Sequence, residues 1–315
     1  MPRLTNEEQK RILKLSENGF SSRGIAEEIF GKTHRKSTIN DFLYKYKSKS
    51  KAELTPKKLG ARILLVDLET SPILAYVWGR WKQNVYQAQV LQESFILTYS
   101  CKWLGEDEIL YGYLSPSEVK LENDFRIVNE LRDIINSADI LITHNGIQFD
   151  FPIINTRCVY HRIAPPSNYR PIDTLRIARN KFRFSSNKLN DLCEYLGLGV
   201  KEENGGFDTW VGYLNGKTEA IQKMVTYNIK DVELLENLYL RLRPFDNSHP
   251  NIQIYQKDIN NISCPCCGSE DIQKTDKLFY TNLSAFDAYF CVDCGKRFRG
   301  RKNVIKKREN LIIGT

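Results

Sequence analysis

The pattern of apolar and polar positions between residues 62 and 243 predicts a domain that mixes strands with helices. Four short apolar segments have the length and composition of strands: RILLVDLE (62–69), SFILTYSCKW (94–103), EILYGYLS (108–115) and DILITHN (139–145). Helical periodicity is expected at residues 124–138, 151–162, 173–181, 188–197 and 218–241. Strands followed by alternation with helices are typical of α/β domains, so we expect a mixed sheet covered by helices.

The segments that flank this region have different patterns. Residues 4–46 have the spacing of three short helices, the last at about 37–46. Thr5 and Glu8 are expected to form a capping box for the first helix, and Ser22 is expected to cap the second. The stretch KYKSKSKAELTPKKLG is basic and contains a proline, as linkers do. We expect a three-helix domain at 1–47, a basic linker at 48–61, the α/β domain at 62–243, a linker at 244–260 and a cysteine-rich end at 261–315.

Basic residues gather toward both ends of the chain. The formal net charge of +8 over 315 residues divides into +7 for residues 1–60, −3 for 61–260 and +4 for 261–315. A near-neutral centre between basic flanks favours a polyanion such as nucleic acid, although such residues also simply solubilise exposed helices. No apolar run approaches the roughly 20 residues of a membrane helix, and the first residues lack the apolar core of a signal peptide. We therefore expect a cytoplasmic protein without membrane contact.

Five of the eight cysteines lie close together near the end of the sequence. Clustered cysteines in a chain without a secretion signal favour a metal over disulfides. The segment resembles a zinc ribbon, which implies one structural Zn²⁺, and Cys266 is left over. Residues 296–309 hold eight Lys and Arg, which favours nucleic-acid binding; protein contact or simple stability is the alternative. Two C-x-x-C-G motifs supply the four thiolates expected to bind zinc: Cys264, Cys267, Cys291 and Cys294.

Four acids and one tyrosine stand at positions where chemistry is expected. Asp67 and Glu69 end the first strand on one face, because side chains at i and i+2 of a strand point the same way. Asp150 follows a buried strand and a glycine turn, where a helix begins. Tyr227 and Asp231 are four residues apart and share one face of the last long helix. Taken singly, such residues are most often helix caps, solvated charges or packing.

The ordered combination of these residues is more informative than any one of them. D-x-E after the first strand, N-x-x-x-F-D in HNGIQFDFPII and Y-x-x-x-D in YNIKDVELL resemble the motifs of DnaQ-like 3′–5′ exonucleases. The third motif resembles that of the branch of these exonucleases whose third motif carries tyrosine rather than histidine (DEDDy). DTLRIARNKFRFSSNKLNDLCEYLGL resembles a segment of the family-B-polymerase-type members, so the resemblance covers residues 62–243. It implies an RNase H-like fold, a mixed sheet flanked by helices, and hydrolysis of phosphodiesters from free 3′ ends.

The resemblance also implies a metal site. Neighbouring carboxylates repel each other, and two divalent cations about 4 Å apart would remove that repulsion. Ligands that are all oxygen favour Mg²⁺ or Mn²⁺. By resemblance, Asp67 bridges both ions, and Glu69 and Asp231 complete the site that activates water. Asp150 supports the second ion through water, and Tyr227 orients the attacking water with Glu69. Tyrosine suits that role, because an ordinary pKa near 10 keeps it protonated.

Substrate contacts are expected beside the second motif and after it. Asn145 and Phe149 match positions next to the terminal nucleotide, with burial in the core as the alternative for Phe149. RNKFRFSSNK alternates basic residues with phenylalanines, so Arg183 and Lys188 are expected to meet phosphates while the rings stack on bases. The alternative is a helix end with buried phenylalanines. Ser186 is expected as a substrate contact or, like its neighbour Ser185, as the cap of the next helix.

The N-terminal segments SSRGIAEEI and STINDFLYKY resemble the homeodomain-like helix-turn-helix of recombinases and transposases, whose third helix enters the major groove. The intervening FGKTHRK is longer than usual, which leaves a small protein-binding helical module as the alternative.

Together these features predict a metal-dependent 3′–5′ exonuclease in replication, repair or recombination. DNA is the favoured substrate and RNA the alternative. The expected setting is a bacterial or phage-infected cell, with a polymerase or another replication or repair protein as partner. A transposase- or resolvase-like endonuclease is one alternative function. A DNA-binding regulator with a silent nuclease core is another.

Overall fold

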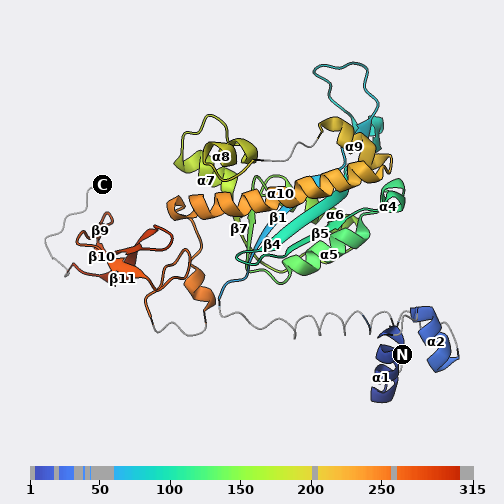
Figure 1. Ribbon diagram of the computed structural model, residues 1–315, viewed down its shortest axis with the longest axis horizontal. Helices are drawn as coiled ribbons and strands as arrows, with labels where there is room; N and C mark the ends of the chain where they lie inside the picture. The colour runs from blue at the N-terminus through green and yellow to red at the C-terminus, as the bar shows by residue number, and fades with distance from the viewer. Residues whose placement is uncertain are drawn as a thin grey trace. The chain divides into compact units, whose positions relative to one another are not determined.

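The computed structural model describes residues 4–17, 21–31, 38–39, 43, 60–200, 205–256 and 261–305 of the chain (Figure 1). The chain divides into two compact units, residues 1–58 and residues 59–315. Within the described residues, no helix is long and apolar enough to cross a bilayer.

The first unit contains helices α1 (Asn6–Glu17) and α2 (Ser22–Phe30) among its described residues. The capping box of α1 is present, because the Thr5 N–H donates to Glu8 Oε2 at 2.7 Å and the Glu8 N–H to Thr5 Oγ1 at 3.3 Å. The cap of α2 is Ser21 and not Ser22, which already belongs to the helix. The expected third helix at 37–46 lies outside the described residues except for positions 38, 39 and 43. The core of this unit is built from Ile12, Ile25, Ala26 and Ile39.

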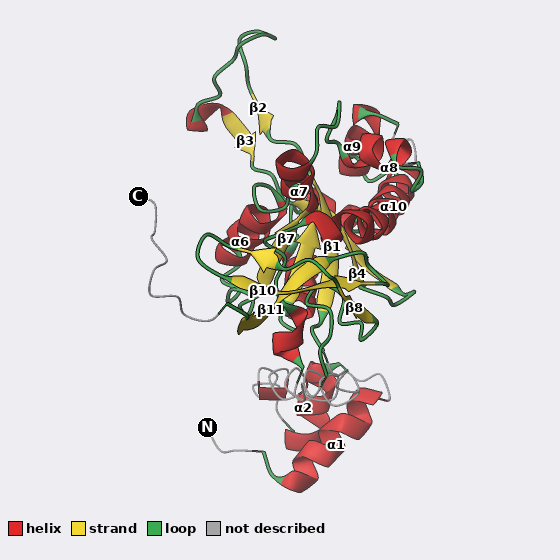
Figure 2. Cartoon of the chain, turned by 90° about the vertical axis from the view of Figure 1, so that its left-hand side faces the viewer, coloured by secondary structure: helices red, strands yellow, loops and turns green. Residues whose placement is uncertain are grey.

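A five-stranded mixed sheet forms the centre of the second unit (Figures 1 and 2). The strand order is β5-β4-β1-β6-β7. Strand β4 is antiparallel to both β1 and β5, whereas β6 is parallel to β1 and to β7. The strands are β1 (Ile63–Thr70), β4 (Ile96–Trp103), β5 (Ile109–Tyr113), β6 (Ile140–Thr143) and β7 (Arg170–Asp173).

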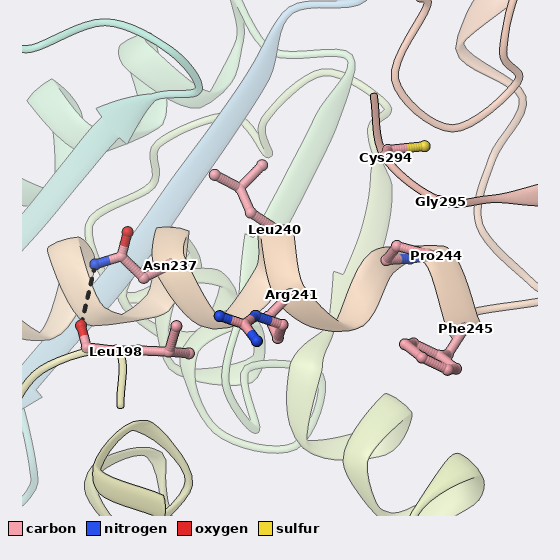
Figure 3. A pocket seen from close by; sticks show the side chains of 8 residues that line it. All are labelled: Leu198, Asn237, Leu240, Arg241, Pro244, Phe245, Cys294 and Gly295. Carbon is pink, nitrogen blue, oxygen red and sulfur yellow. Dashed lines mark hydrogen bonds between the residues drawn. The ribbon is translucent and has the colours of Figure 1, made fainter. Parts of the chain in front are cut away.

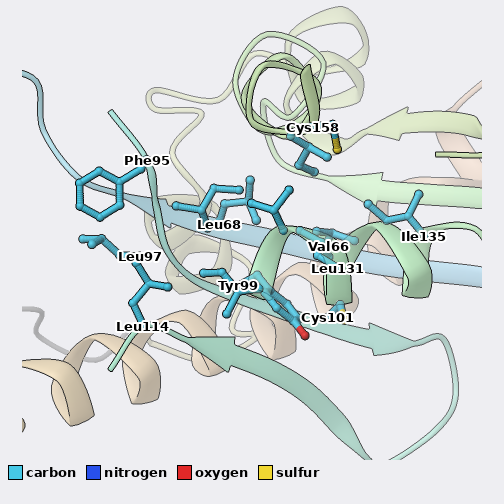
Figure 4. Packing of buried hydrophobic residues seen from close by; sticks show 14 of the residues in the cluster. Val66, Leu68, Phe95, Leu97, Tyr99, Cys101, Leu114, Leu131, Ile135 and Cys158 are labelled. Carbon is cyan, nitrogen blue, oxygen red and sulfur yellow. The ribbon is translucent and has the colours of Figure 1, made fainter. Parts of the chain in front are cut away.

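Helices cover both faces of this sheet. Leu64, Val66 and Leu68 of β1 pack with α5 and α6 in one buried cluster, part of which is drawn in Figure 4. Ile63 and Leu65 point to the other face and pack with α7, α8 and α10. Because side chains alternate along a strand, Asp67 and Glu69 share the face toward α10. The helices are α4 (Pro116–Lys120), α5 (Phe125–Ile135), α6 (Asp150–Tyr160), α7 (Thr174–Lys181), α8 (Leu189–Tyr195), α9 (Phe207–Leu214) and α10 (Thr218–Leu242).

The predicted α/β architecture, a mixed sheet flanked by helices, is confirmed. The long periodic helix expected at 218–241 is α10, and the four expected strands are β1, β4, β5 and β6. Short elements were not predicted, because two to four residues carry too little periodicity to identify a strand. These are the hairpin strands β2 (Leu74–Ala75) and β3 (Val90–Gln92) and the edge strand β7. The helices α4 and α9, of five and eight residues, were not predicted either.

The cysteine-rich end forms a second small sheet. Its order is β11-β10-β8, and β9 also pairs with β10. Lys296 Nζ donates to the Asp246 carbonyl oxygen at 2.7 Å, and Cys266 Sγ lies 3.7 Å from the Arg243 carbonyl oxygen. This end therefore docks on the segment that follows α10. The elements are β8 (Ile272–Lys274), β9 (Phe279–Tyr280), β10 (Ala285–Cys291) and β11 (Arg297–Asn303), preceded by the 3₁₀ turns η3 (Arg243–Phe245) and η4 (Ile252–Tyr255).

Candidate active site and cysteine cluster

Three of the predicted acids meet where β1 faces α10. One carboxylate oxygen each from Asp67, Glu69 and Asp231 lies within 4.8 Å of the other two. Asp67 and Glu69 come from one face of β1, and Asp231 is a buried residue of α10. Carboxylates at such distances repel one another unless a positive charge is nearby, so the cluster has the chemistry of a site for a hard cation.

The fourth acid, Asp150, is not part of this cluster but is bonded to the strand that carries it. Asp150 is the first residue of α6 and is 3% exposed, and the Leu68 backbone N–H donates to its carboxylate. Burial raises the pKa of Asp150 to about 7, although this N–H lowers it. Its Oδ1 atom is buried without a hydrogen-bond partner among the described residues. A cation would fit this oxygen and would favour the ionised carboxylate.

Helix α10 brings two more polar side chains to the same place. Tyr227 is buried one turn before Asp231, as its spacing predicts. Asn228 is fully buried, and its Nδ2 donates to Asp67 Oδ2 at 2.7 Å. Asn228 was not predicted from the sequence. The available signal was an asparagine, a poor helix former, in the middle of a strongly helical stretch.

Asp173 fixes the loop that leads to Asp150. It caps α7, and its Oδ1 also accepts the Asn145 backbone N–H at 3.0 Å. Asn145 has a φ of 75°, a left-handed conformation that asparagine tolerates better than most residues. A Cβ on Gly146 would lie 2.3 Å from Thr143 Oγ1, so the loop has room for glycine alone. The second motif is therefore held in one conformation, which sets where α6 begins.

The predicted substrate contacts are partly exposed and partly packed. Phe149 is 43% exposed beside Asp150, so the alternative that placed it in the core is wrong. Arg183 and Lys188 are exposed, and Asn145 is half-buried. The two phenylalanines between the basic residues stack on each other, with ring centroids 5.0 Å apart, and pack against the core, as the alternative interpretation had it.

Ser186 is not the cap of α8, and neither is Ser185, because the N-cap position is Lys188. The Ser186 hydroxyl donates to Asp191 in the first turn of α8. His144, which was not predicted, contacts the Asn187 carbonyl oxygen through Nε2 at 2.9 Å. This bond ties the basic segment at 183–188 to the loop that precedes Asp150.

The four cysteines predicted to bind zinc are close together. The Cys264 and Cys294 sulfurs are 3.5 Å apart, and those of Cys267 and Cys291 are 3.6 Å apart. All are free thiols, and all four sulfurs lie within 4.8 Å of one another. Four sulfurs at such spacing fit a tetrahedral Zn²⁺, whose bonds to sulfur are about 2.3 Å long. Burial raises the pKa of Cys294 to about 11, and a bound Zn²⁺ would instead favour the thiolate.

A cavity of about 460 Å³ lies where the end of α10 meets the cysteine-rich end (Figure 3). Leu240, Arg241 and Phe245 line it from one side and Cys294 and Gly295 from the other. None of the four acids lines this cavity, so it is separate from the carboxylate cluster.

Comparisons with known proteins show what the central region is similar to. Residues 91–243 match the family model described as the RNase H superfamily, and the match begins after β1. A PolC-type DNA polymerase III from Ureaplasma parvum serovar 3 is 25% identical over 132 residues, which cover 37% of this chain and 9% of that protein. The family B DNA polymerase from the hyperthermophilic archaeon Pyrobaculum calidifontis superposes with a TM-score of 0.45 at 13% identity, over 58% of this chain and 25% of that one. The chain thus spans a small fraction of either relative.

Proposed function

We propose that the protein is a metal-dependent 3′–5′ exonuclease of the DnaQ-like type acting on DNA, starting from the match of residues 91–243 to the family model of the RNase H superfamily. The observation that carries the proposal is the meeting of the Asp67, Glu69 and Asp231 carboxylates within 4.8 Å. Hydrolysis of a phosphodiester requires a deprotonated water and neutralised charge on the attacking and leaving oxygens. Two Mg²⁺ or Mn²⁺ ions supply both when bound.

Each residue of the site has a proposed part. Asp67 would help to hold the ions and is itself held by Asn228, whose Nδ2 donates to it at 2.7 Å. Glu69 and Asp231 would complete the metal site at which water is activated, and Asp150 would support the second ion. Tyr227 offers a hydroxyl donor on the same helix face as Asp231, and its part is to orient the attacking water.

The choice of substrate rests on the surroundings of these acids. Phe149 is exposed next to Asp150, where a terminal base can stack on it. The basic residues Arg183 and Lys188 lie on a segment bonded to the same loop, so they are suited to binding phosphates. The similarity to a protein named as a DNA polymerase supports DNA as the substrate class and replication or repair as the setting.

The flanking segments are proposed to assist. The four clustered cysteines suit one structural Zn²⁺ that stabilises a zinc ribbon within 261–315. The basic charge of this end, and of the proposed helix-turn-helix domain at 1–47, supports nucleic-acid binding by both. Residues 62–243 would form the exonuclease domain between the proposed linkers at 48–61 and 244–260.

The proposal is tested with 5′-labelled DNA and RNA strands incubated with the full chain and Mg²⁺ or Mn²⁺. We expect stepwise shortening from the 3′ end, abolished by EDTA and by Asp67→Ala. Asp107→Ala is the matched control, because Asp107 is an exposed acid in the turn after β4 and should leave cleavage unchanged.

A nicked circle and a closed circle separate the alternatives. An exonuclease degrades the nicked form only, whereas cleavage of closed circles would indicate an endonuclease. Ladders that persist in Asp67→Ala would show that the carboxylate cluster is not the site of hydrolysis.

A further inference from the structure

A long hairpin leaves the sheet directly after the acids of β1. It contains β2, β3 and the 3₁₀ turn η2 (Gln87–Gln89), and in Figure 2 the loop beyond β2 and β3 extends away from the five-stranded sheet. Its base is closed by Ser71, whose N–H donates to the Phe95 carbonyl oxygen at 2.8 Å and whose Oγ accepts the Phe95 N–H at 2.9 Å. The hairpin is therefore attached firmly at the end of β1, two residues after Glu69.

The loop exposes its largest side chains. Trp78 is 98% exposed and Trp81 is 84% exposed, and Tyr76 and Tyr86 are also on the surface. Contiguous exposed aromatic residues of this size are unusual on a globular surface and mark binding sites. The hairpin keeps its shape through its own polar bonds, such as Gln89 Nε2 to the Tyr76 carbonyl oxygen at 2.8 Å. The tryptophan rings thus contribute almost nothing to the packing of the fold.

The charge of the hairpin indicates the kind of partner. Residues 71–92 contain Arg80 and Lys82 but no aspartate or glutamate, in a chain whose 61–260 region is otherwise net negative. In the sequence WGRWK, the cations lie next to the two exposed tryptophans. Flat rings interleaved with cations match a strand of unpaired nucleotides, in which bases and phosphates also alternate.

The position of the hairpin relative to the acids agrees with that partner. The Thr70 carbonyl oxygen, where the hairpin begins, accepts a bond from Trp210 Nε1 at 3.1 Å, which fixes the end of β1. Trp78 follows Ser71 by seven positions and Trp81 by ten, so these two residues lie within about 25 Å and about 36 Å of the base of the hairpin, respectively. A strand whose end lies at the carboxylates would reach the rings within a few nucleotides.

We propose that residues 71–92 form an arm that binds single-stranded nucleic acid. Trp78 and Trp81 stack on unpaired bases, and Arg80 and Lys82 contact the phosphates between them. Stacking and phosphate contact need no 2′-hydroxyl, so the arm accepts DNA and RNA alike. The location of the strand's end rests on the proposed function, whereas binding by the arm does not.

The test uses the full chain without added Mg²⁺ or Mn²⁺, so that no cleavage occurs and zinc stays bound, with fluorescently labelled 16-nucleotide dT and rU strands and anisotropy as the readout. Replacing both tryptophans by alanine should raise the Kd by about 5- to 150-fold for each ring. The double phenylalanine variant should keep most of the affinity. Tyr160→Ala, which removes an exposed aromatic residue on α6, should bind like the wild type. Replacing Arg80 and Lys82 by glutamine should reduce the slope of log K against log salt by about 1.4.

A small ester separates this inference from the proposed function. The p-nitrophenyl ester of thymidine 5′-monophosphate is too short to reach the arm, so its hydrolysis with Mn²⁺ reports on the carboxylates alone. The alanine variant should hydrolyse the ester at the wild-type rate while binding strands weakly.

If that variant binds strands like the wild type, the inference about the arm is wrong, and the proposed exonuclease function is not affected. If the wild type hydrolyses neither ester nor strands but still binds through the tryptophans, the nuclease proposal fails and the arm stands. Wild-type dimers that the alanine variant does not form, together with no strand binding, would overturn the inference in favour of a protein contact.

Discussion

Replacing Asn228 by alanine tests whether a buried amide positions Asp67 for metal binding. The Nδ2 of Asn228 donates to Asp67 Oδ2 at 2.7 Å in a fully buried setting. A hydrogen bond to a charged group contributes about 1.5–3 kcal/mol. Loss of the partner of a metal ligand typically lowers metal affinity about 10- to 100-fold, which corresponds to about 1.4–2.7 kcal/mol. Since the two estimates agree, we expect the Mn²⁺ affinity to fall by about one to two orders of magnitude.

Titration calorimetry with Mn²⁺ measures this affinity directly, without reliance on catalysis. Asn237→Ala is the matched control, because Asn237 lies on the same helix and donates to the Leu198 carbonyl oxygen at 3.4 Å, away from the acids. Cleavage by Asn228→Ala should recover at high Mn²⁺ if the amide acts only through metal binding. Asn228→Asp should destabilise the metal-free protein more than alanine does, because a buried carboxylate would replace a donor beside Asp67.

An unchanged Mn²⁺ affinity in Asn228→Ala, with unfolding like that of the wild type, would refute this reasoning. It would mean that the strand alone fixes the Asp67 carboxylate and that the amide is a packing residue.

Three further predictions concern stability and zinc. Cys291→Ser should reduce the bound zinc, measured by atomic absorption, from about one per chain to none, whereas Cys266→Ser should retain it, because the Cys266 sulfur lies against the Arg243 carbonyl oxygen. Asp124→Ala should lower the unfolding free energy in urea by about 3–5 kcal/mol, because it removes the ion-pair partner of the buried Arg157, whose Nη2 lies 2.6 Å from Asp124 Oδ1. Adding Arg157→Met to this variant should recover part of the lost stability. Gly146→Ala should cost about 1–3 kcal/mol in the same assay, because its Cβ would collide with Thr143, and an unchanged midpoint would contradict the close packing of this loop.

The sheet and its helices were predictable because burial gives long elements a clear period. The β1 strand is apolar on both faces until Asp67 and Glu69, and α10 keeps helical spacing over 25 residues. The residue at which a helix begins was harder to predict than the helix itself. Ser21 and Ser22 are both good caps, and only the backbone conformation decides that Ser21 is the cap of α2. Short strands depend on what lies beside them, which local sequence does not record.

The carboxylate cluster was predictable for a different reason. Acids at the end of a buried strand and on one face of a late helix are rarely placed together without a charge to balance them, and their order resembles a known set of motifs. The bond from Asn228 to Asp67 and the bridge from Asp173 to Asn145 join positions 161 and 28 residues apart. Such contacts depend on the fold, so no local pattern in the sequence predicted them. The exposure of Trp78 was not predicted either, because tryptophan is usually at least partly buried.

The wide separation of β1 and α10 along the chain has a consequence for biosynthesis. A ribosome makes Asp67 and Glu69 long before Asp231, and Asp231 reaches them only when the last long helix packs onto the finished sheet. A partly made chain therefore carries two of the clustered acids but not the third. Any hydrolysis that depends on all three acids therefore requires the chain to be translated past Asp231. Chains that end earlier are expected not to cleave nucleic acids.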